Sequence, residues 1–221
     1  SNRWFYGIPV VILTLTVFDI AIFYSAPDLL YGWALHLPPR DHEGWHLLSS
    51  ICVHFDTDHL YMNMFTQLVV GSLLEFFHGP FRVLTIYICA GVIGGAMQLL
   101  LTARAPIYIA GASGAIYGLM GAFGADLFFN WKERPYPYFW LFGYVALFTI
   151  DAIDSLTKDS TGIALWAHYT GALSGLLFAI AVARNIRIER YEPIVRFVTM
   201  ILDIVLLLAI LLYTLLYLRL Y

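Results

Sequence analysis

Long apolar stretches alternate with short polar segments along the whole chain. A helix that crosses a bilayer needs roughly 20 mostly apolar residues, and seven stretches of the sequence fit this template. They cover about 5–25, 58–76, 82–102, 112–130, 137–152, 163–183 and 196–219. The pattern predicts an all-α polytopic membrane protein with a long loop, at about 26–57, between the first two spans.

The composition supports this class. The chain has 221 residues, of which 61% are hydrophobic and 12% charged, whereas soluble domains carry about 45–50% apolar and roughly 25% charged residues. A net charge of −3 offers no basic surface for nucleic acid. Cys52 and Cys89 are too few for a disulfide scaffold or a zinc site. A water-soluble globule, a disordered chain and a nucleic-acid binder are excluded, and we expect no metal and no cofactor.

Lysine and arginine near the span ends indicate the direction of insertion, because they accumulate on the cytoplasmic side. With a cytoplasmic N-terminus, that side holds Arg3, Arg82, Lys132, Arg134, Arg184, Arg187, Arg190 and Arg196. The opposite side then holds Arg40, Arg104, Lys158 and Arg219. The second, fourth and sixth spans therefore run from outside to inside, and their N-terminal ends share the outer face.

The second span carries a polar stripe. His59, Asn63, Gln67 and Gly71 recur every four residues and are expected on one helical face. Polar groups inside a bilayer are costly, so each needs a partner. For Gln67 we favour a structural hydrogen bond between helices.

The fourth span opens with a serine. Ser113 lies in the first helical turn, where unpaired backbone N–H groups and the helix dipole favour negative charge. Gly114 and Gly118 follow at the spacing that lets two membrane helices approach closely.

The sixth span carries a histidine on a close-packing face. Gly171 and Gly175 lie near His168 on the helical wheel, and His168 is roughly five residues below the outer end. Together with His59 and Ser113, this places two histidines and a serine near one membrane face. Such a set is the minimum for nucleophilic acyl transfer.

These motifs identify a resemblance to a known family. The segment from Gly111 to Gly118 resembles the Gly-x-Ser-Gly motif of the rhomboid intramembrane serine proteases. His59-x-x-x-Asn63 resembles their second-helix motif, and the segment from His168 to Gly175 resembles their sixth-helix motif. The resemblance implies a six-helix rhomboid core at 1–190 with a seventh transmembrane helix at 191–221. This order is similar to that of secretory-pathway members, which implies a plasma or secretory-pathway membrane.

The resemblance also implies roles for individual residues. It makes Ser113 the nucleophile and His168 its base, with an oxyanion hole formed by the His59 and Asn63 side chains and the Ser113 N–H. Tyr117 would pack under the His168 ring. The substrate gate would comprise Tyr138, Phe139, Trp140 and Phe142. Substrates would be single-pass membrane proteins cleaved near the outer or lumenal face.

Two alternatives and several unassigned residues remain at this point. A catalytically inactive relative would bind membrane proteins and control their traffic or degradation, and a transporter or proton channel would use the polar stripe.

His46 stands where many rhomboids have arginine after Trp45, and His54 fits a structural role. Three carboxylates lie in or near spans. We expect Asp126 to be solvated, and Asp19 and Asp203 to be buried with hydrogen bonds or in the neutral form.

Overall fold

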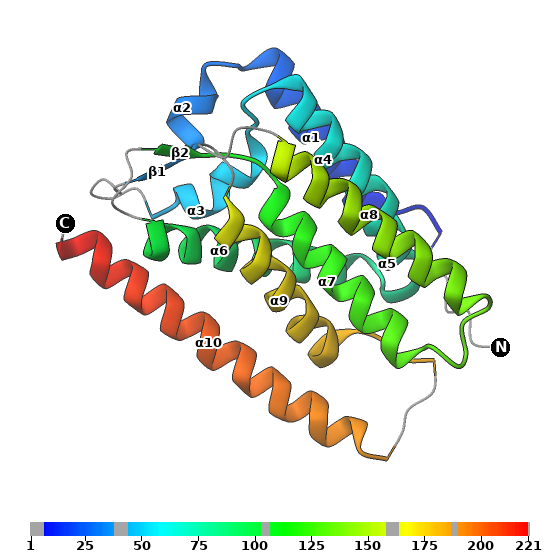
Figure 1. The fold of residues 1–221 in the computed structure, drawn as a ribbon. Coiled ribbons are helices and arrows are strands. Elements are labelled where there is room, and N and C mark those ends of the chain that lie inside the picture. Colours follow the sequence, from blue (N-terminus) through cyan, green and yellow to red (C-terminus); the bar gives the residue numbers. More distant parts are fainter. Residues whose placement is uncertain (1–6, 38–43, 103–106, 158–163, 187–189, 221) are drawn as a thin grey trace.

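Figure 1 shows the fold in a computed structural model, which describes residues 7–37, 44–102, 107–157, 164–186 and 190–220. A helix or pair of helices occupies each of the seven predicted spans. They are α1 (Val10–Ser25), α4 and α5 (Thr57–Thr66 and Ser72–His78), α6 (Pro80–Thr102), α7 (Ser113–Phe129), α8 (Pro137–Thr157), α9 (Leu165–Val182) and α10 (Glu192–Leu220). The predicted helical bundle is therefore confirmed.

Several of these helices have the length and polarity of membrane spans. Four stretches are long and apolar enough to cross a bilayer: Thr57–His78, Pro80–Thr102, Leu165–Val182 and Glu192–Thr214. Shorter apolar helices cover Val10–Ser25, Ser113–Phe129 and Pro137–Ile150. These features indicate a multi-pass membrane protein.

Helix α7 lies in the middle of the bundle, between α8 on one side and α6 and α9 on the other, while α10 covers the outer side of α6 and α9 (Figure 1). Glycine allows the closest contact, between α7 and α9. A methyl group added at Gly171 would overlap the carbonyl oxygen of Gly114, and one added at Gly175 would overlap that of Gly118. The two backbones touch directly, which fixes the relative position of the residues that these helices carry.

The second span is not one continuous α-helix. Between α4 and α5 lies η2 (Gln67–Gly71), a π-helical turn. A π turn contains an extra residue and rotates the side chains on its C-terminal side to a different face. Asn63 and Gln67 precede this rotation, because the Gln67 N–H still donates to the Asn63 carbonyl oxygen, so only Gly71 is shifted relative to the predicted polar face. Asn63 lies near Gly111, and Gln67 donates from Nε2 to Thr16 Oγ1 of α1 at 3.0 Å. The structural hydrogen bond expected for Gln67 is confirmed.

A small sheet was not predicted. Strand β1 (Leu35–Leu37) pairs antiparallel with β2 (Ile107–Ile109), and Leu35 lies opposite Ile109. Strands of three residues are too short to show a period of two in the sequence. Since β2 immediately precedes α7, this sheet ties the long first loop to the chain that leads into Ser113.

The long loop also contains α2 (Leu29–Trp33), α3 (His46–Ser49) and the 3₁₀ turn η1 (Ser50–Cys52). His46 is buried between the rings of Trp45 and His36, with centroids 4.0 and 5.4 Å away. The residue that replaces the common family arginine thus braces the loop by ring packing.

A buried polar cluster closes the opposite end of α7. Asp126 is only 3% exposed and forms an ion pair with Arg134, so the expectation that it is solvated is wrong. It also accepts from Asn130 Nδ2 at 2.8 Å and lies 3.2 Å from His78 Nε2. The chain after α7 folds back and brings the arginine to it. Asp19 and Asp203 are buried, as expected.

Cationic residues assigned to the cytoplasmic side gather at this same end. Arg82 Nε, near the start of α6, donates to the carbonyl oxygen of Val182 at the end of α9. Lys132 and Arg134 follow α7. Five of the cations used to orient the chain lie outside the described residues: Arg3, Arg40, Arg104, Lys158 and Arg187. The first residues of the first predicted span also lie outside them.

Candidate active site

Ser113 and His168 meet at the end of the bundle that carries the sheet. Ser113 is the first residue of α7, and its Oγ lies 2.8 Å from Nε2 of His168 on α9. His168 is 8% exposed and Ser113 is half-buried. Because α9 begins at Leu165, His168 lies three residues into its helix and not five. A hydroxyl within hydrogen-bond distance of an imidazole is the arrangement that activates a serine nucleophile.

Aromatic packing holds the His168 ring in place. The Tyr117 ring, one turn after Ser113, is stacked on the His168 ring with centroids 4.3 Å apart and planes at 13°. Phe148 of α8 contacts Tyr117 edge-on at 5.8 Å. Among the described residues, no group hydrogen-bonds to the buried Nδ1 of His168. The imidazole is therefore oriented by stacking, with no carboxylate partner in the described part of the chain.

Several donors surround the start of α7. The N–H of Ser113, at the first helical position, has no acceptor within the helix. Gly111 has φ of +127°, a conformation that favours glycine. A Cβ there would lie 2.9 Å from His59 Nε2 and 3.5 Å from Asn63 Nδ2, so both side chains lie against the backbone just before Ser113. Asn63 is 8% exposed, and its Nδ2 has no hydrogen-bond partner in the described residues.

The segment before Ser113 is held by two neighbours. The Gly111 N–H donates to the Ser50 carbonyl at 2.9 Å, and the Ala112 N–H donates to His54 Nε2 at 3.4 Å. The rings of His54 and His59 are in edge contact, with centroids 5.3 Å apart. Burial, and then His59, lower the pKa of His54 to about 3 against a weaker opposing effect of Asp56. His54 is therefore a neutral acceptor at physiological pH.

Gln98 is a positioning residue that sequence reasoning missed. Its Oε1 accepts from the N–H of Ala167 at 3.2 Å, which satisfies one of the unpaired donors at the start of α9. Gly94 lies one turn earlier on α6, and a Cβ added there would be only 2.8 Å from the Ala167 carbonyl oxygen. The missing side chain therefore lets α6 pack closely against the start of α9. The available signal was a buried amide in an otherwise apolar span. Gln98 thus fixes the residue next to His168.

The four predicted gate residues lie away from this pair. Because α8 runs antiparallel to α7, its first turns pack near the far end of α7, where Trp140 contacts Phe123 at 6.3 Å. Trp140 Nε1 donates to the Pro135 carbonyl. The remaining three side chains are exposed: Tyr138, Phe139 and Phe142. On α8, Phe148 contacts Tyr117, the residue on which the His168 ring is stacked, and the sequence did not indicate this contact.

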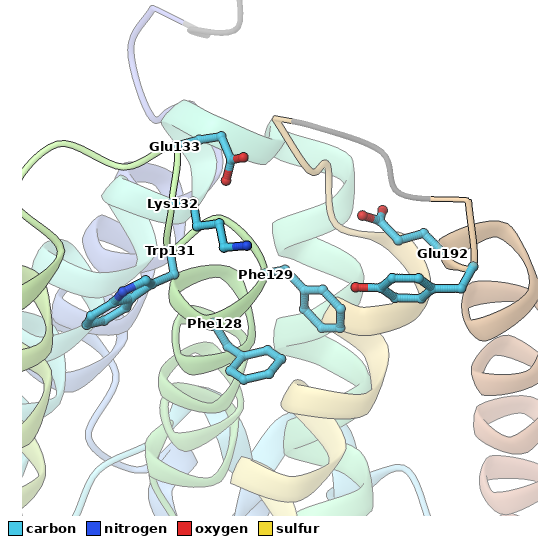
Figure 2. Close-up of a pocket in the computed structure, with 7 residues that line it drawn as sticks. Phe128, Phe129, Trp131, Lys132, Glu133 and Glu192 are labelled. Atoms are coloured by element: carbon cyan, nitrogen blue, oxygen red, sulfur yellow. The ribbon is translucent and has the colours of Figure 1, made fainter.

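Two cavities differ sharply in character. A small one of about 20 Å³ adjoins Ser113 and is lined mostly by glycine and alanine, including Gly91, Gly95 and Ala167. A larger one of about 720 Å³ lies at the opposite end, between the turn after α7 and the start of α10 (Figure 2). Figure 2 shows Phe129 and Lys132 on its wall, facing Glu192 across the opening. The larger of these two cavities is therefore not the one that contains the candidate nucleophile Ser113. Among the described residues no group of three potential metal ligands occurs.

The fold and the site define a multi-pass helical membrane protein with a serine–histidine pair at the start of its central helix. Residues 41–185 match the Rhomboid domain family. The chain therefore belongs to the rhomboid family.

Individual relatives agree with this family. The chain is 30% identical to Rhomboid-related protein 1 of Caenorhabditis elegans over 184 residues, covering 81% of this chain and 50% of that protein. It is 26% identical to human Rhomboid-related protein 3 over 222 residues, covering 84% and 52%. It is also 33% identical to Inactive RHOMBOID-like protein 8 of Arabidopsis thaliana over 93 residues, covering 42% and 26%. The chain spans about half the length of the first two relatives.

Proposed function

We propose that this protein is an intramembrane serine endopeptidase that cleaves transmembrane segments of single-pass membrane proteins with a Ser113–His168 dyad. The observation that carries the proposal is the 2.8 Å contact between Ser113 Oγ and His168 Nε2, at a buried helix start inside a membrane bundle. Family membership supports it, because rhomboids are generally intramembrane serine proteases.

In the first step, Ser113 Oγ attacks the scissile carbonyl carbon while His168 Nε2 accepts the hydroxyl proton. The negative charge moves to the carbonyl oxygen. Donors available nearby are the Ser113 N–H, the unpaired Asn63 Nδ2 and His59. When the tetrahedral intermediate collapses, the C–N bond breaks and His168 returns the proton to the leaving amine. A serine ester remains.

Hydrolysis of that ester requires one water beside Ser113. A water needs a cavity of about 10–15 Å³, and the small cavity next to Ser113 has about 20 Å³. Its glycine and alanine walls also favour substrates with small side chains near the cut. Water attacks the ester carbonyl and gives one proton to His168 Nε2. When this second tetrahedral intermediate collapses, His168 returns the proton to Ser113 Oγ, which leaves as the free hydroxyl, and the carboxylic acid product is released.

The substrate backbone must leave its own helical hydrogen bonds before it reaches the dyad, and lipid supplies no replacements. Substrates should therefore contain helix-weakening residues near the cut. The excess of lysine and arginine that the sequence places in the segments at the far end of the bundle supports a cytoplasmic position for that end. The dyad then lies toward the outer or lumenal face of a plasma or secretory-pathway membrane.

The alternative is a rhomboid-like binder without proteolytic activity, and one relative is named as inactive. Gel-based cleavage of a single-span model substrate, together with labelling by a serine-reactive fluorophosphonate, separates the two. The parent should cleave and become labelled, and Ser113→Ala should do neither.

Ser174→Ala is a matched control, because Ser174 is a buried serine of α9 whose Oγ has no hydrogen-bond partner in the described residues. It should retain both activities. Labelling of a folded parent that Ser113→Ala does not reduce, or no labelling at all, would favour the binder.

A further inference from the structure

The larger cavity described above lies at the end of the bundle opposite to Ser113. It has a volume of about 720 Å³ and lies between the end of α7, the turn that follows and the start of α10 (Figure 2). We refer to it as the α7–α10 cavity. Its volume is in the range of about 300–1,000 Å³ that is usual for small-molecule sites. Neither Ser113 nor His168 lines it, so the proposed dyad makes no use of this space.

The turn after α7 gives this cavity two charges of opposite sign. The ammonium group of Lys132 points into the opening, and Glu133 lies beside it on the same turn (Figure 2). Lys132 is exposed and Glu133 is half-buried, so a ligand can reach both side chains. In the described part of the chain, neither of them forms an ion pair. This wall therefore offers a cation and an anion side by side, both available to a ligand.

The carboxylate on the opposite wall is already matched within the protein. Glu192 Oε2 accepts from Asn185 Nδ2 at 2.7 Å and lies 3.8 Å from Nη2 of Arg196. These contacts fix the side chain of Glu192 and balance its charge. The charges that a ligand has to complement are therefore those of Lys132 and Glu133.

The lining and its surroundings are typical of a membrane–water boundary. Trp131 and Tyr191 line the cavity, and tryptophan and tyrosine accumulate at the level of the lipid headgroups. Next to it, Phe128 of α7 and Ile194 of α10 are 76% and 68% exposed. In a membrane-spanning bundle such apolar side chains face hydrocarbon. An amphiphile with its polar end in the cavity would thus find apolar surface for its chains on both helices.

We propose that the α7–α10 cavity binds the headgroup of a zwitterionic phospholipid. Lys132 binds the phosphate and Glu133 binds the ammonium group, each through a charge-assisted contact. The rings of Phe129 and Tyr191 also favour a cation in this space. A purely anionic headgroup leaves Glu133 without a partner and is repelled by it, so charge complementarity selects the zwitterion.

Photolabelling tests this proposal and does not require proteolysis. The probe is phosphatidylethanolamine with a diazirine next to the ester of one acyl chain, added to the full chain in an uncharged detergent. Mass spectrometry locates the label, which should concentrate in residues 128–133 and 191–197. Unlabelled phosphatidylethanolamine should compete several-fold better than phosphatidylglycerol, because only the former carries an ammonium group.

Three variants separate the two charges from a general effect of cations at this end of the bundle. Lys132→Gln should lower the label about two- to fivefold, as expected for an ion pair near the surface. Glu133→Gln should make phosphatidylethanolamine and phosphatidylglycerol compete equally. The control is Arg190→Gln, which removes an exposed cation that does not line the cavity, and it should change neither result.

The proposal is overturned if the label spreads over the other helices, if the parent does not distinguish the two lipids, or if Arg190→Gln has the effect of Lys132→Gln. Water-soluble glycerophosphoethanolamine separates a lipid from a free headgroup. It should compete poorly, because hydrocarbon burial supplies much of the binding, and competition equal to that of the lipid would exclude a lipid site. Ser113→Ala should label like the parent, so failure of the proteolytic function leaves this result unchanged.

Discussion

The ring of Tyr117 lies nearly parallel to the ring of His168, at 13° and with centroids 4.3 Å apart. Tyr117 belongs to the same helix as Ser113 and is one turn further along, so α7 carries both the hydroxyl and the surface on which the imidazole rests. The described residues offer no acceptor for Nδ1 of His168. Stacking therefore orients the imidazole of His168, a role that a carboxylate has in serine–histidine–aspartate triads.

Replacing Tyr117 should separate ring stacking from the phenol hydroxyl. Aromatic pairs contribute about 0.5–1.5 kcal/mol beyond area burial, so Tyr117→Leu should lower kcat about 2- to 10-fold. Tyr117→Phe keeps the stacked ring and should remain near the parent. Single-turnover cleavage of a model substrate measures both. Equal losses in the two variants would assign the role to the hydroxyl instead.

Asn63 should act mainly on the transition state. Removing one oxyanion donor typically costs about 100- to 1,000-fold in kcat, and we expect this for Asn63→Ala with little change in KM. Gln67→Met is the matched control on the same span, because its hydrogen bond to Thr16 is structural. It should leave kcat near the parent while lowering stability by about 1 kcal/mol. Similar kinetics in both variants would argue against an oxyanion role for Asn63.

The contact between α7 and α9 should tolerate no added methyl group. Gly171→Ala places a Cβ on the Gly114 carbonyl oxygen and should destabilise the fold by about 1–3 kcal/mol through overpacking. At Gly143 on α8 a Cβ meets nothing within 4 Å. Gly143→Ala should therefore stabilise the helix by up to about 1 kcal/mol. Denaturation in mild detergent measures both, and a neutral Gly171→Ala would contradict the close backbone contact.

The Asp126–Arg134 pair should show strong coupling. Arg134→Met leaves a buried carboxylate without its cation and should cost about 3–5 kcal/mol. Replacing both partners, as in Arg134→Met with Asp126→Leu, should recover most of that loss, since Asn130 Nδ2 still donates to the Asp126 backbone carbonyl. A double-mutant cycle on unfolding free energies checks this, and additive losses would contradict it.

His54 should make stability fall in acid. Its pKa is lowered from the ordinary 6.5 to about 3, first by burial and then by His59. The unfolded chain therefore takes up the proton first. This contribution is complete above pH 6.5 and is lost as the pH falls towards 3. The slope it adds is at most about 1.4 kcal/mol per pH unit.

His54→Leu should flatten that part of the pH profile. The measurement is the difference between parent and variant unfolding free energies at several values between about pH 4 and pH 7. A constant difference across this interval would show that the ring is accessible to protons in the folded protein.

The sequence identified the spans well, because bilayer thickness imposes one length and one polarity on each. It also singled out Ser113 and His168, since a serine at a helix start and a histidine beside glycines are local patterns. The structure places these two side chains in contact.

Features that depend on direction or on distant partners were harder to predict. The aromatic residues at 138–142 stand out in the sequence, yet the antiparallel course of α8 carries them to the far end and brings Phe148 to Tyr117. The sequence suggests that Asp126 is solvated, because it does not show that the turn after α7 brings Arg134 back to this carboxylate. The π turn at Gln67–Gly71 was not expected either, because polar positions four residues apart are equally compatible with a continuous α-helix.

The length of α7 has a consequence for depth. Its 17 residues extend about 25 Å, which is less than the roughly 30 Å hydrocarbon layer. A helix of this length that runs along the membrane normal, with the polar turn of Lys132 and Glu133 at one boundary, would hold Ser113 about 5 Å beneath the other. The length of the helix thus sets how far below the surface the hydroxyl is held, and inserting one turn into it would raise Ser113 to the level of the headgroups.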